Sequence, residues 1–175
     1  SSNMMPEVWV RIAEIIADKY ADYDGFVILH GSDTMAYTAS ALSFMLNGLN
    51  KPVILTGSQL PIGTIRTDGK ENLITAIEIA VAKKANQPLV PEVAIYFEYN
   101  LYRGNRTTKA NSEDFEAFES FNYPLLAEAG IRIKYNTRNI LEVDAQRGLN
   151  VFKMFDRNVA PLKLFPGITK EFISH

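Results

Sequence analysis

A hydroxyl, a carboxylate and a second hydroxyl follow one another at Ser32, Asp33 and Thr34. They come directly after an apolar run, Phe26 to Leu29, and the pair His30–Gly31, where a helical pattern of apolar residues begins. Serine and aspartate are favoured helix caps because their oxygens accept the unpaired N–H groups of the first turn. The same side chains also act as nucleophiles and proton carriers. Capping is the more common role, and the sequence leaves both interpretations open.

A second polar stretch, RGNRTTKA from Arg103 to Ala110, contains a candidate partner in Lys109. Its composition also suits a solvated basic turn, which is the alternative interpretation. A lysine buried beside a hydroxyl and a carboxylate loses its preference for the charged form by desolvation and can accept a proton. Ser32, Lys109 and Asp33 would then be hydroxyl, base and orienting carboxylate, which is the logic of a catalytic triad with lysine in place of histidine.

The residue types present argue against several other chemistries. The chain has no cysteine and only His30 and His175, so we expect neither disulfides nor a metal centre. His30 is expected to be a packed histidine at a strand end. No Gly-x-Ser-x-Gly elbow surrounds Ser32 or Ser58, and no phosphate-binding Gly-Lys-Ser/Thr loop exists. The glycosylation sequon at Asn105 is interpreted as chance because no secretion signal accompanies it.

The composition is that of a globular protein close to neutrality. Of 175 residues, 47% are apolar and 22% are charged, and the formal net charge is -2. A chain without a basic excess is a poor binder of nucleic acid or anionic membranes, so neither is expected as a partner. No apolar stretch is long enough to cross a bilayer and no targeting segment is recognised, which predicts a soluble, cytoplasmic protein.

Apolar periodicity predicts alternating helices and strands. The expected elements are a helix after Pro6, a strand at 26–29, a helix over about 34–47, a strand at 53–55, a helix from Asp68–Gly69 and a strand at 93–97. Strands that are apolar throughout indicate burial on both faces, and hence a parallel sheet covered by helices. Alternating stretches near 131–135 and 151–155 predict an antiparallel extension. The expected fold class is therefore α/β, a parallel three-layer α/β/α sandwich of the Rossmann or flavodoxin type with this extension.

Ligands bind outside the carboxyl ends of the strands in open parallel sheets. Three polar segments leave such ends, HGSDT, TGSQLP and EYNLYRGNRTTKA, and we expect crossover helices to bring all three to one edge. The polar side chains that they supply are Ser32, Asp33, Thr34, Thr56, Ser58, Gln59, Arg103, Arg106 and Lys109.

The motifs DGFVILHGSDTMAYTASALSFMLNGLNKPVILTGSQLP and LYRGNRTTKA closely resemble those of bacterial L-asparaginases, in particular the cytoplasmic type I group. The resemblance extends from SSNMMPEVW to LFPGI. It implies hydrolysis of L-asparagine to L-aspartate and ammonia through hydroxyl nucleophiles, with no metal or organic cofactor. It also implies a larger and a smaller α/β domain, and homodimers or homotetramers with active sites near subunit contacts.

Residue by residue, the resemblance implies that Ser32, Asp33 and Lys109 are the hydroxyl, carboxylate and lysine of the family's triad. Asp33 is also expected to hold the substrate's α-ammonium group, and N–H groups near Gly31 and Ser32 to stabilise an oxyanion. The backbone carbonyl of Ser58 is expected to meet the substrate's side-chain amide, and the N-terminal serines to bind its carboxylate. The implied substrate-binding residues are Ser1, Ser2, Gly31, Ser32, Asp33 and Ser58.

The chain departs from the family pattern in two respects. No Thr-Gly-Gly-Thr motif, the family's nucleophile strand, is present, and the chain ends soon after the expected second domain begins. We therefore expect a partial N-terminal domain at 1–140, a linker at 141–158 and the first strand and helix start of a C-terminal domain at 159–175, with no activity for the chain alone. In addition, Ser32 stands where the family usually has threonine, which keeps the hydroxyl but removes the methyl that restricts χ1.

Two alternatives make different predictions. The first is another amidase of the same family, a glutaminase or a tRNA-dependent amidotransferase subunit, although the near-neutral charge argues weakly against tRNA. The second is a non-catalytic flavodoxin-like binding module, in which Ser32 and Asp33 only cap a helix. In that module Lys109 would lie far from Ser32 and in solvent, so the distance between these side chains discriminates.

Overall fold

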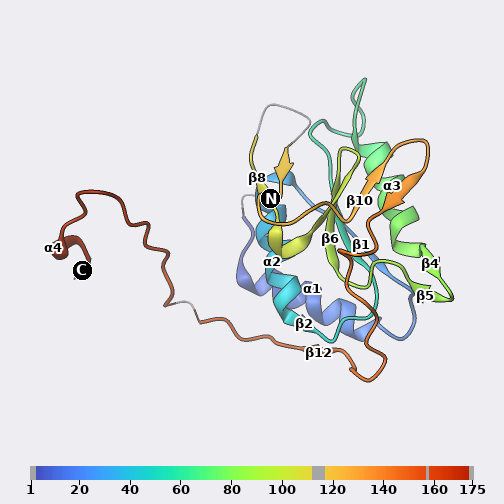
Figure 1. Ribbon diagram of the computed structural model, residues 1–175, viewed down its shortest axis with the longest axis horizontal. Coiled ribbons are helices and arrows are strands. Elements are labelled where there is room, and N and C mark those ends of the chain that lie inside the picture. The colour runs from blue at the N-terminus through green and yellow to red at the C-terminus, as the bar shows by residue number, and fades with distance from the viewer. Residues whose placement is uncertain (1–2, 112–116, 157, 174–175) are drawn as a thin grey trace.

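The computed structural model describes residues 3–111, 117–156 and 158–173. Its centre is a six-stranded sheet with strand order β1-β3-β6-β7-β10-β11 (Figure 1). These strands are β1 (Phe26–Leu29), β3 (Val53–Thr56), β6 (Val93–Phe97), β7 (Asn100–Arg103), β10 (Ala127–Ala129) and β11 (Ile133–Tyr135). The first three are parallel, and the last three extend the sheet in antiparallel fashion. The predicted parallel core is therefore confirmed, and so is the antiparallel extension near 131–135, where β11 lies. The prediction is wrong for 151–155, because only Val151 belongs to a strand, β12 (Asn150–Val151), and this strand pairs with β2 (Leu46–Asn47) in a separate sheet.

Three helices cover the two faces of this sheet. Helices α1 (Pro6–Asp18) and α2 (Ser32–Met45) pack on one face, and α3 (Gly69–Val81) packs on the other (Figure 1). Side chains alternate along β3, so that Val53 and Leu55 join the core under α1 and α2 while Ile54 joins the core under α3. All four residues of β3 are buried, as the continuous apolar run predicts.

Shorter elements complete the structure. They are β2 (Leu46–Asn47) paired with β12 (Asn150–Val151), β4 (Lys83–Lys84) paired with β5 (Gln87–Pro88), β8 (Thr108–Lys109) paired with β9 (Phe118–Glu119), the 3₁₀ turn η1 (Gly104–Arg106) and α4 (Lys170–Ile173). The β8–β9 pair carries Lys109, one of the predicted triad residues.

After β12 the chain leaves the body as the extended segment coloured red in Figure 1. Its beginning is held by an ion pair between Lys153 and Glu14 (2.8 Å) and by ring contact between Phe155 and Trp9. Residues 159–173, in the region where the start of a second domain is expected, lie in no ladder within the described part of the chain. A strand requires a neighbour to pair its N–H and C=O groups, and among the described residues none pairs with this segment. The division into domains at 140 and 158 stays a prediction.

A tight hairpin reverses the chain after β6. Its two turn residues, Glu98 and Tyr99, both have positive φ (43° and 69°), as a two-residue hairpin of this kind requires. The hairpin makes β7 antiparallel to β6 and pairs Arg103 with Ala94 near the start of β6. The expectation that all three polar segments lie at one edge is therefore wrong for Arg103 and Arg106, because a two-residue connection cannot make the next strand parallel.

Arg103 has a structural role at that opposite edge. Its guanidinium donates to both carboxylate oxygens of Glu92 (2.6 and 3.2 Å) and to the carbonyl oxygen of Asn139 (2.9 Å). It also lies 4.2 Å from the ring centroid of Tyr123. Glu92 is only 4% exposed and accepts a further bond from the backbone N–H of Leu141. This ion pair ties β6 and β7 to the chain that follows the sheet.

Replacing Glu92 with alanine is expected to lower the free energy of unfolding by about 3 kcal/mol, because Arg103 then keeps its charge in a largely buried position without its carboxylate counter-ion. Asp24→Ala serves as the control, since it breaks an exposed pair with Lys83 and is expected to cost less than about 1 kcal/mol. Urea denaturation of both variants measures the difference. Equal losses for the two variants would contradict the assigned role.

Candidate active site

The hydroxyl–carboxylate pair lies in the first turn of α2. Gly31 has extended backbone angles (φ -69°, ψ 142°) and is the cap residue, so the helix begins at Ser32 rather than near Thr34. The interpretation of Ser32 as a helix cap is therefore wrong, since a capping side chain must precede the first helical residue. Asp33 is in the first turn, where the helix dipole favours a negative charge. Both side chains are thus presented at the carboxyl end of β1.

Lys109 reaches this helix end from the β8–β9 ladder. The chain passes between α2 and β6 at Gly104, where an added Cβ would lie only 2.9 Å from the Val93 carbonyl oxygen and 3.1 Å from that of Ala39. Lys109 is then paired with Phe118, which is buried and packs edge-on against Phe97 (ring centroids 5.1 Å apart). A buried aromatic anchor therefore fixes the strand that carries the lysine.

The three predicted triad residues meet. Lys109 Nζ donates to Asp33 Oδ1 at 2.8 Å and to Ser32 Oγ at 3.0 Å. The lysine side chain is 14% exposed and the aspartate side chain 66% exposed, so the ammonium is largely enclosed while its counter-ion faces solvent. The structure thus brings together residues that are 76 and 77 positions apart in the sequence.

Gln59 joins this cluster from the loop after β3. Its Oε1 accepts a hydrogen bond from Ser32 Oγ at 3.2 Å. The sequence placed Gln59 among the polar candidates but assigned it no role, and its position just beyond a buried strand was the signal available. Ser32 therefore stands between two partners: it accepts from the lysine and donates to the glutamine.

The loops after β1 and β3 approach each other very closely. An added Cβ at Gly57 would lie 2.1 Å from the carbonyl oxygen of His30, so no side chain fits there. Ser58 follows at once and packs against Gly69 at the start of α3, where an added Cβ would lie 3.0 Å from the Ser58 Cβ. These contacts bring residues 58 and 59 beside the start of α2. The predicted role of the Ser58 carbonyl stays a prediction.

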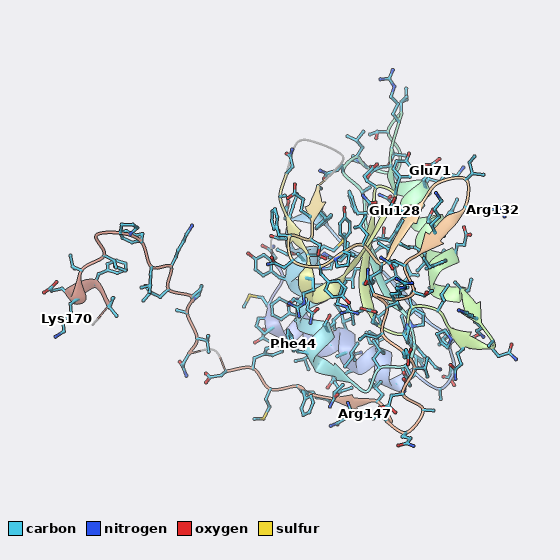
Figure 2. All side chains as sticks on the ribbon, in the orientation of Figure 1. Phe44, Glu71, Glu128, Arg132, Arg147 and Lys170 are labelled. Atoms are coloured by element: carbon cyan, nitrogen blue, oxygen red, sulfur yellow. The ribbon has the colours of Figure 1, made fainter. Side chains whose placement is uncertain are left out.

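The other predicted candidates lie in different surroundings. Thr56 is buried and donates to the carbonyl oxygen of Tyr96 (2.8 Å), which is a structural bond between neighbouring strands. Arg106 lines a pocket of about 410 Å³ at the opposite edge, together with Arg103 and Arg147. Figure 2 shows Arg147 at the far end of the body from Glu71. Ser1 and Ser2 lie outside the described residues.

His30 is a packed histidine, as predicted. Its Nδ1 donates to the Gly31 carbonyl oxygen (2.7 Å), and its Nε2 accepts from the Thr38 hydroxyl (2.9 Å), which in turn accepts from the indole N–H of Trp9 (2.9 Å). Burial lowers the pKa of His30, and its bond to the Gly31 carbonyl opposes this effect only in part. The neutral imidazole thus holds the segment that leads into Ser32.

Beside the Lys109–Asp33 ion pair the surface forms a pocket of about 450 Å³, lined by Asp33, Ala36, Tyr37, Ser40, Thr107, Thr108 and Lys109. In the part of the chain that the structure describes, no group of three or more His, Cys, Asp and Glu side chains is placed to hold a metal ion. Among the same residues, no helix combines the length and apolarity needed to cross a membrane.

Comparison with known proteins identifies the family of this chain. Residues 1–141 match the family model described as asparaginase, N-terminal. This chain belongs to the asparaginase family. It carries the N-terminal domain of the type I L-asparaginase group, as the motifs predicted.

Individual asparaginase-family relatives cover the whole chain. It is 50% identical over 174 residues to L-asparaginase 1 of Escherichia coli K12, covering 99% of this chain and 49% of that protein. It is 43% identical to the 60 kDa lysophospholipase of Mus musculus, covering 99% of this chain and 30% of the relative. It is 37% identical to a glutamyl-tRNA(Gln) amidotransferase subunit of Thermococcus kodakarensis, covering 99% of this chain and 40% of the relative.

The asparaginase fold is also seen directly in a solved structure. The crystal structure of L-asparaginase I from Vibrio cholerae superposes with a TM-score of 0.88 at 47% sequence identity, covering 99% of this chain and 51% of that one. The chain therefore spans about half the length of the Escherichia coli and Vibrio cholerae asparaginases. It is a homologue of asparaginase-family amidohydrolases.

The lowered pKa of His30 predicts a pH-dependent stability for this asparaginase-family domain. The unfolded imidazole titrates near 6.5 and the folded one below that value, so the folded state binds fewer protons between the two pKa values. The free energy of unfolding is expected to be at its full value above pH 6.5 and to fall as the pH drops through the folded pKa. Urea denaturation between about pH 7 and 5 measures this loss. A His30→Gln variant should lose less over the same range, and parallel curves would rule the histidine out.

Proposed function

We propose that the protein hydrolyses L-asparagine to L-aspartate and ammonia, with Ser32, Lys109 and Asp33 as its proton-handling triad. The observation that carries the proposal is the position of the Lys109 ammonium, 3.0 Å from the Ser32 hydroxyl and 2.8 Å from the Asp33 carboxylate. A largely enclosed lysine in contact with a hydroxyl is the arrangement in which an amine serves as base toward an oxygen nucleophile. Membership of the asparaginase family supports the choice of an amide as substrate.

The reaction proposed is acyl transfer in two steps. A hydroxyl oxygen attacks the carbon of the substrate's side-chain amide, the amide nitrogen takes a proton and leaves as ammonia, and water then cleaves the acyl-enzyme ester. Asp33, exposed and anionic, is suited to hold the substrate's α-ammonium group. The first-turn N–H groups of α2, near Gly31 and Ser32, are suited to stabilise the oxyanion formed in each step.

Two hydrogen bonds of the structure must rearrange before Lys109 can act as a base toward Ser32. Lys109 donates to Ser32, and Ser32 donates its own hydrogen to Gln59. For Lys109 to withdraw the Ser32 proton, the lysine must first release a proton and the hydroxyl hydrogen must turn from Gln59 toward the lysine. This turn is a rotation about the Cβ–Oγ bond, which leaves the Ser32 oxygen in place. The Asp33 carboxylate stabilises the charged form of Lys109. It therefore also stabilises the state in which Lys109 has taken the proton of Ser32.

Further components of the active protein are part of this proposal. The first hydroxyl nucleophile is supplied by a threonine outside these residues, and Ser1, Ser2 and Ser58 bind the substrate. The division at 1–140, 141–158 and 159–175 corresponds to a partial N-terminal domain, a linker and the start of a second domain. The complete protein is proposed to be a cytoplasmic homodimer or homotetramer that needs no metal or organic cofactor.

A glutaminase or an amidotransferase subunit is the competing function within the family. Of these two, the relative from Thermococcus kodakarensis supports only the amidotransferase subunit. Steady-state kinetics on asparagine and glutamine separate these activities, and a large preference for asparagine is expected. The binding-module alternative required Lys109 to lie in solvent far from Ser32, and the 3.0 Å contact and low exposure of the lysine contradict it.

Ser32→Ala is expected to lower kcat on asparagine by roughly 100-fold to 10,000-fold, the range for a lost proton-transfer group. Ser32→Thr should stay within about tenfold of the unsubstituted protein, because it keeps the hydroxyl and adds a methyl that restricts χ1. Both variants are to be made in the longest natural polypeptide that carries these residues. The triad assignment fails if the Ser32→Ala variant hydrolyses asparagine as fast as the protein with Ser32 does.

The 175 residues by themselves are expected to show no asparaginase turnover, because no Thr-Gly-Gly-Thr strand is present to supply the first nucleophile. An ammonia-release assay on the isolated chain, with circular dichroism to establish that it is folded, makes the measurement. Turnover by the folded chain would refute the need for an outside threonine.

A further inference from the structure

One carboxylate fixes the loop that follows β3. Asp68 accepts the backbone N–H of Gln59 at 2.9 Å through Oδ2 and that of Leu60 at 3.1 Å through Oδ1. Asp68 stands at the cap position of α3, where aspartate commonly bonds the helix's own N–H groups, yet it makes no capping bond. Its oxygens accept backbone N–H groups of the loop rather than those of the helix, and they thereby fix the backbone position of Gln59.

A buried amide holds that carboxylate in place. Asn72, 3% exposed, donates from Nδ2 to Asp68 Oδ2 (3.1 Å) and to the carbonyl oxygen of Gly57 (3.0 Å). Its Oδ1 accepts the backbone N–H of Glu98 (3.3 Å), in the hairpin whose two turn residues have positive φ. Only a side chain that both donates and accepts can make these contacts, so aspartate or leucine cannot replace it.

The network ends at the proposed triad. Asn72 orients Asp68, Asp68 fixes the backbone of Gln59, and the Gln59 side chain accepts the Ser32 hydroxyl (3.2 Å). We propose that Asp68 and Asn72 are positioning residues that set, through Gln59, the position of the Ser32 hydroxyl oxygen relative to Lys109. This inference rests on the proposed function, since it assigns the network to the chemistry of Ser32.

This network gives Ser32 a defined χ1 rotamer, although serine has no β-methyl to restrict that angle. Threonine restricts its χ1 by branching, whereas serine does not. Two hydrogen bonds hold the oxygen of Ser32, one to Gln59 Oε1 and one from the Lys109 ammonium. Loosening the loop lets the Ser32 side chain leave this χ1 rotamer, which lowers the fraction of molecules aligned for reaction.

A double-mutant cycle tests this in the longest natural polypeptide that carries these residues. Gln59→Met removes the acceptor at similar length, and Asn72→Ala removes the anchor of Asp68. Glu71→Ala is the matched control, since Glu71 is an exposed residue of the same helix, labelled in Figure 2. Each change is made with Ser32 and with Ser32→Ala, and kcat and KM for asparagine are measured.

With Ser32 present, Gln59→Met and Asn72→Ala are expected to lower kcat by roughly 10-fold to 100-fold with KM within about threefold, and Glu71→Ala to change neither. With Ser32→Ala, none of the three should lower kcat further, because the group that they position is gone. Full additivity, or a fall in melting temperature without a change in kcat, overturns the proposal. Should Asn72→Ala fail to fold, Gln59→Met carries the same test.

Amide hydrogen exchange gives a readout that needs no turnover. In Asn72→Ala the amides of Gln59 and Leu60 should exchange about tenfold faster than in Glu71→Ala, because Asp68 is no longer held. Unchanged exchange overturns the positioning role whatever the activity. Faster exchange in a protein that does not hydrolyse asparagine would refute the proposed function and leave the network's hold on Gln59 established.

Discussion

The close approach of Gly57 to the carbonyl oxygen of His30 is the constraint on which the rest of the site depends. The parallel pairing of β1 with β3 continues one step further, since the His30 N–H donates to Thr56, and any side chain at position 57 would push the two loops apart. Because the loops nearly touch, Gln59 reaches Ser32 directly, side chain to side chain. The sheet thereby sets the spacing between Gln59 and Ser32 of the proposed triad.

Two ion pairs illustrate how differently the fold uses charge. Glu92 and Arg103 are both largely buried and bond further backbone groups, which locks β6 and β7 together. Lys109 is equally enclosed, but its partner Asp33 is 66% exposed and lies beside an open pocket. The exposed carboxylate of Asp33 is accessible to a positively charged group from solution, whereas the carboxylate of Glu92 is only 4% exposed and is bonded by Arg103 and by the Leu141 N–H. The difference separates a structural pair from one suited to chemistry.

Sequence patterns predicted the strands and the layers well, because continuous apolar runs and helical spacing report burial directly. These patterns failed where the structure depended on a turn between two elements rather than on a run of apolar residues. The hairpin at Glu98–Tyr99 lacks the Asn-Gly or Gly-Gly residues that announce such a turn, so the reversal that removes Arg103 from the site was not foreseen. The start of α2 at Ser32 was missed for a similar reason, since Gly31 is a weaker cap signal than serine.

The sequence by itself determined the α/β class, the family and the three residues of the proposed triad, because these follow from periodicity and from the residues of the motifs. Only the tertiary structure decided that Lys109 lies within hydrogen-bond distance of Ser32, that Gln59 is the third partner, and that Asp68 and Asn72 stand behind it. The contacts of Ser32 join segments 27 and 77 residues apart. Their formation depends on the packing of Phe118 and the close approaches at Gly57 and Gly104, which no local pattern records.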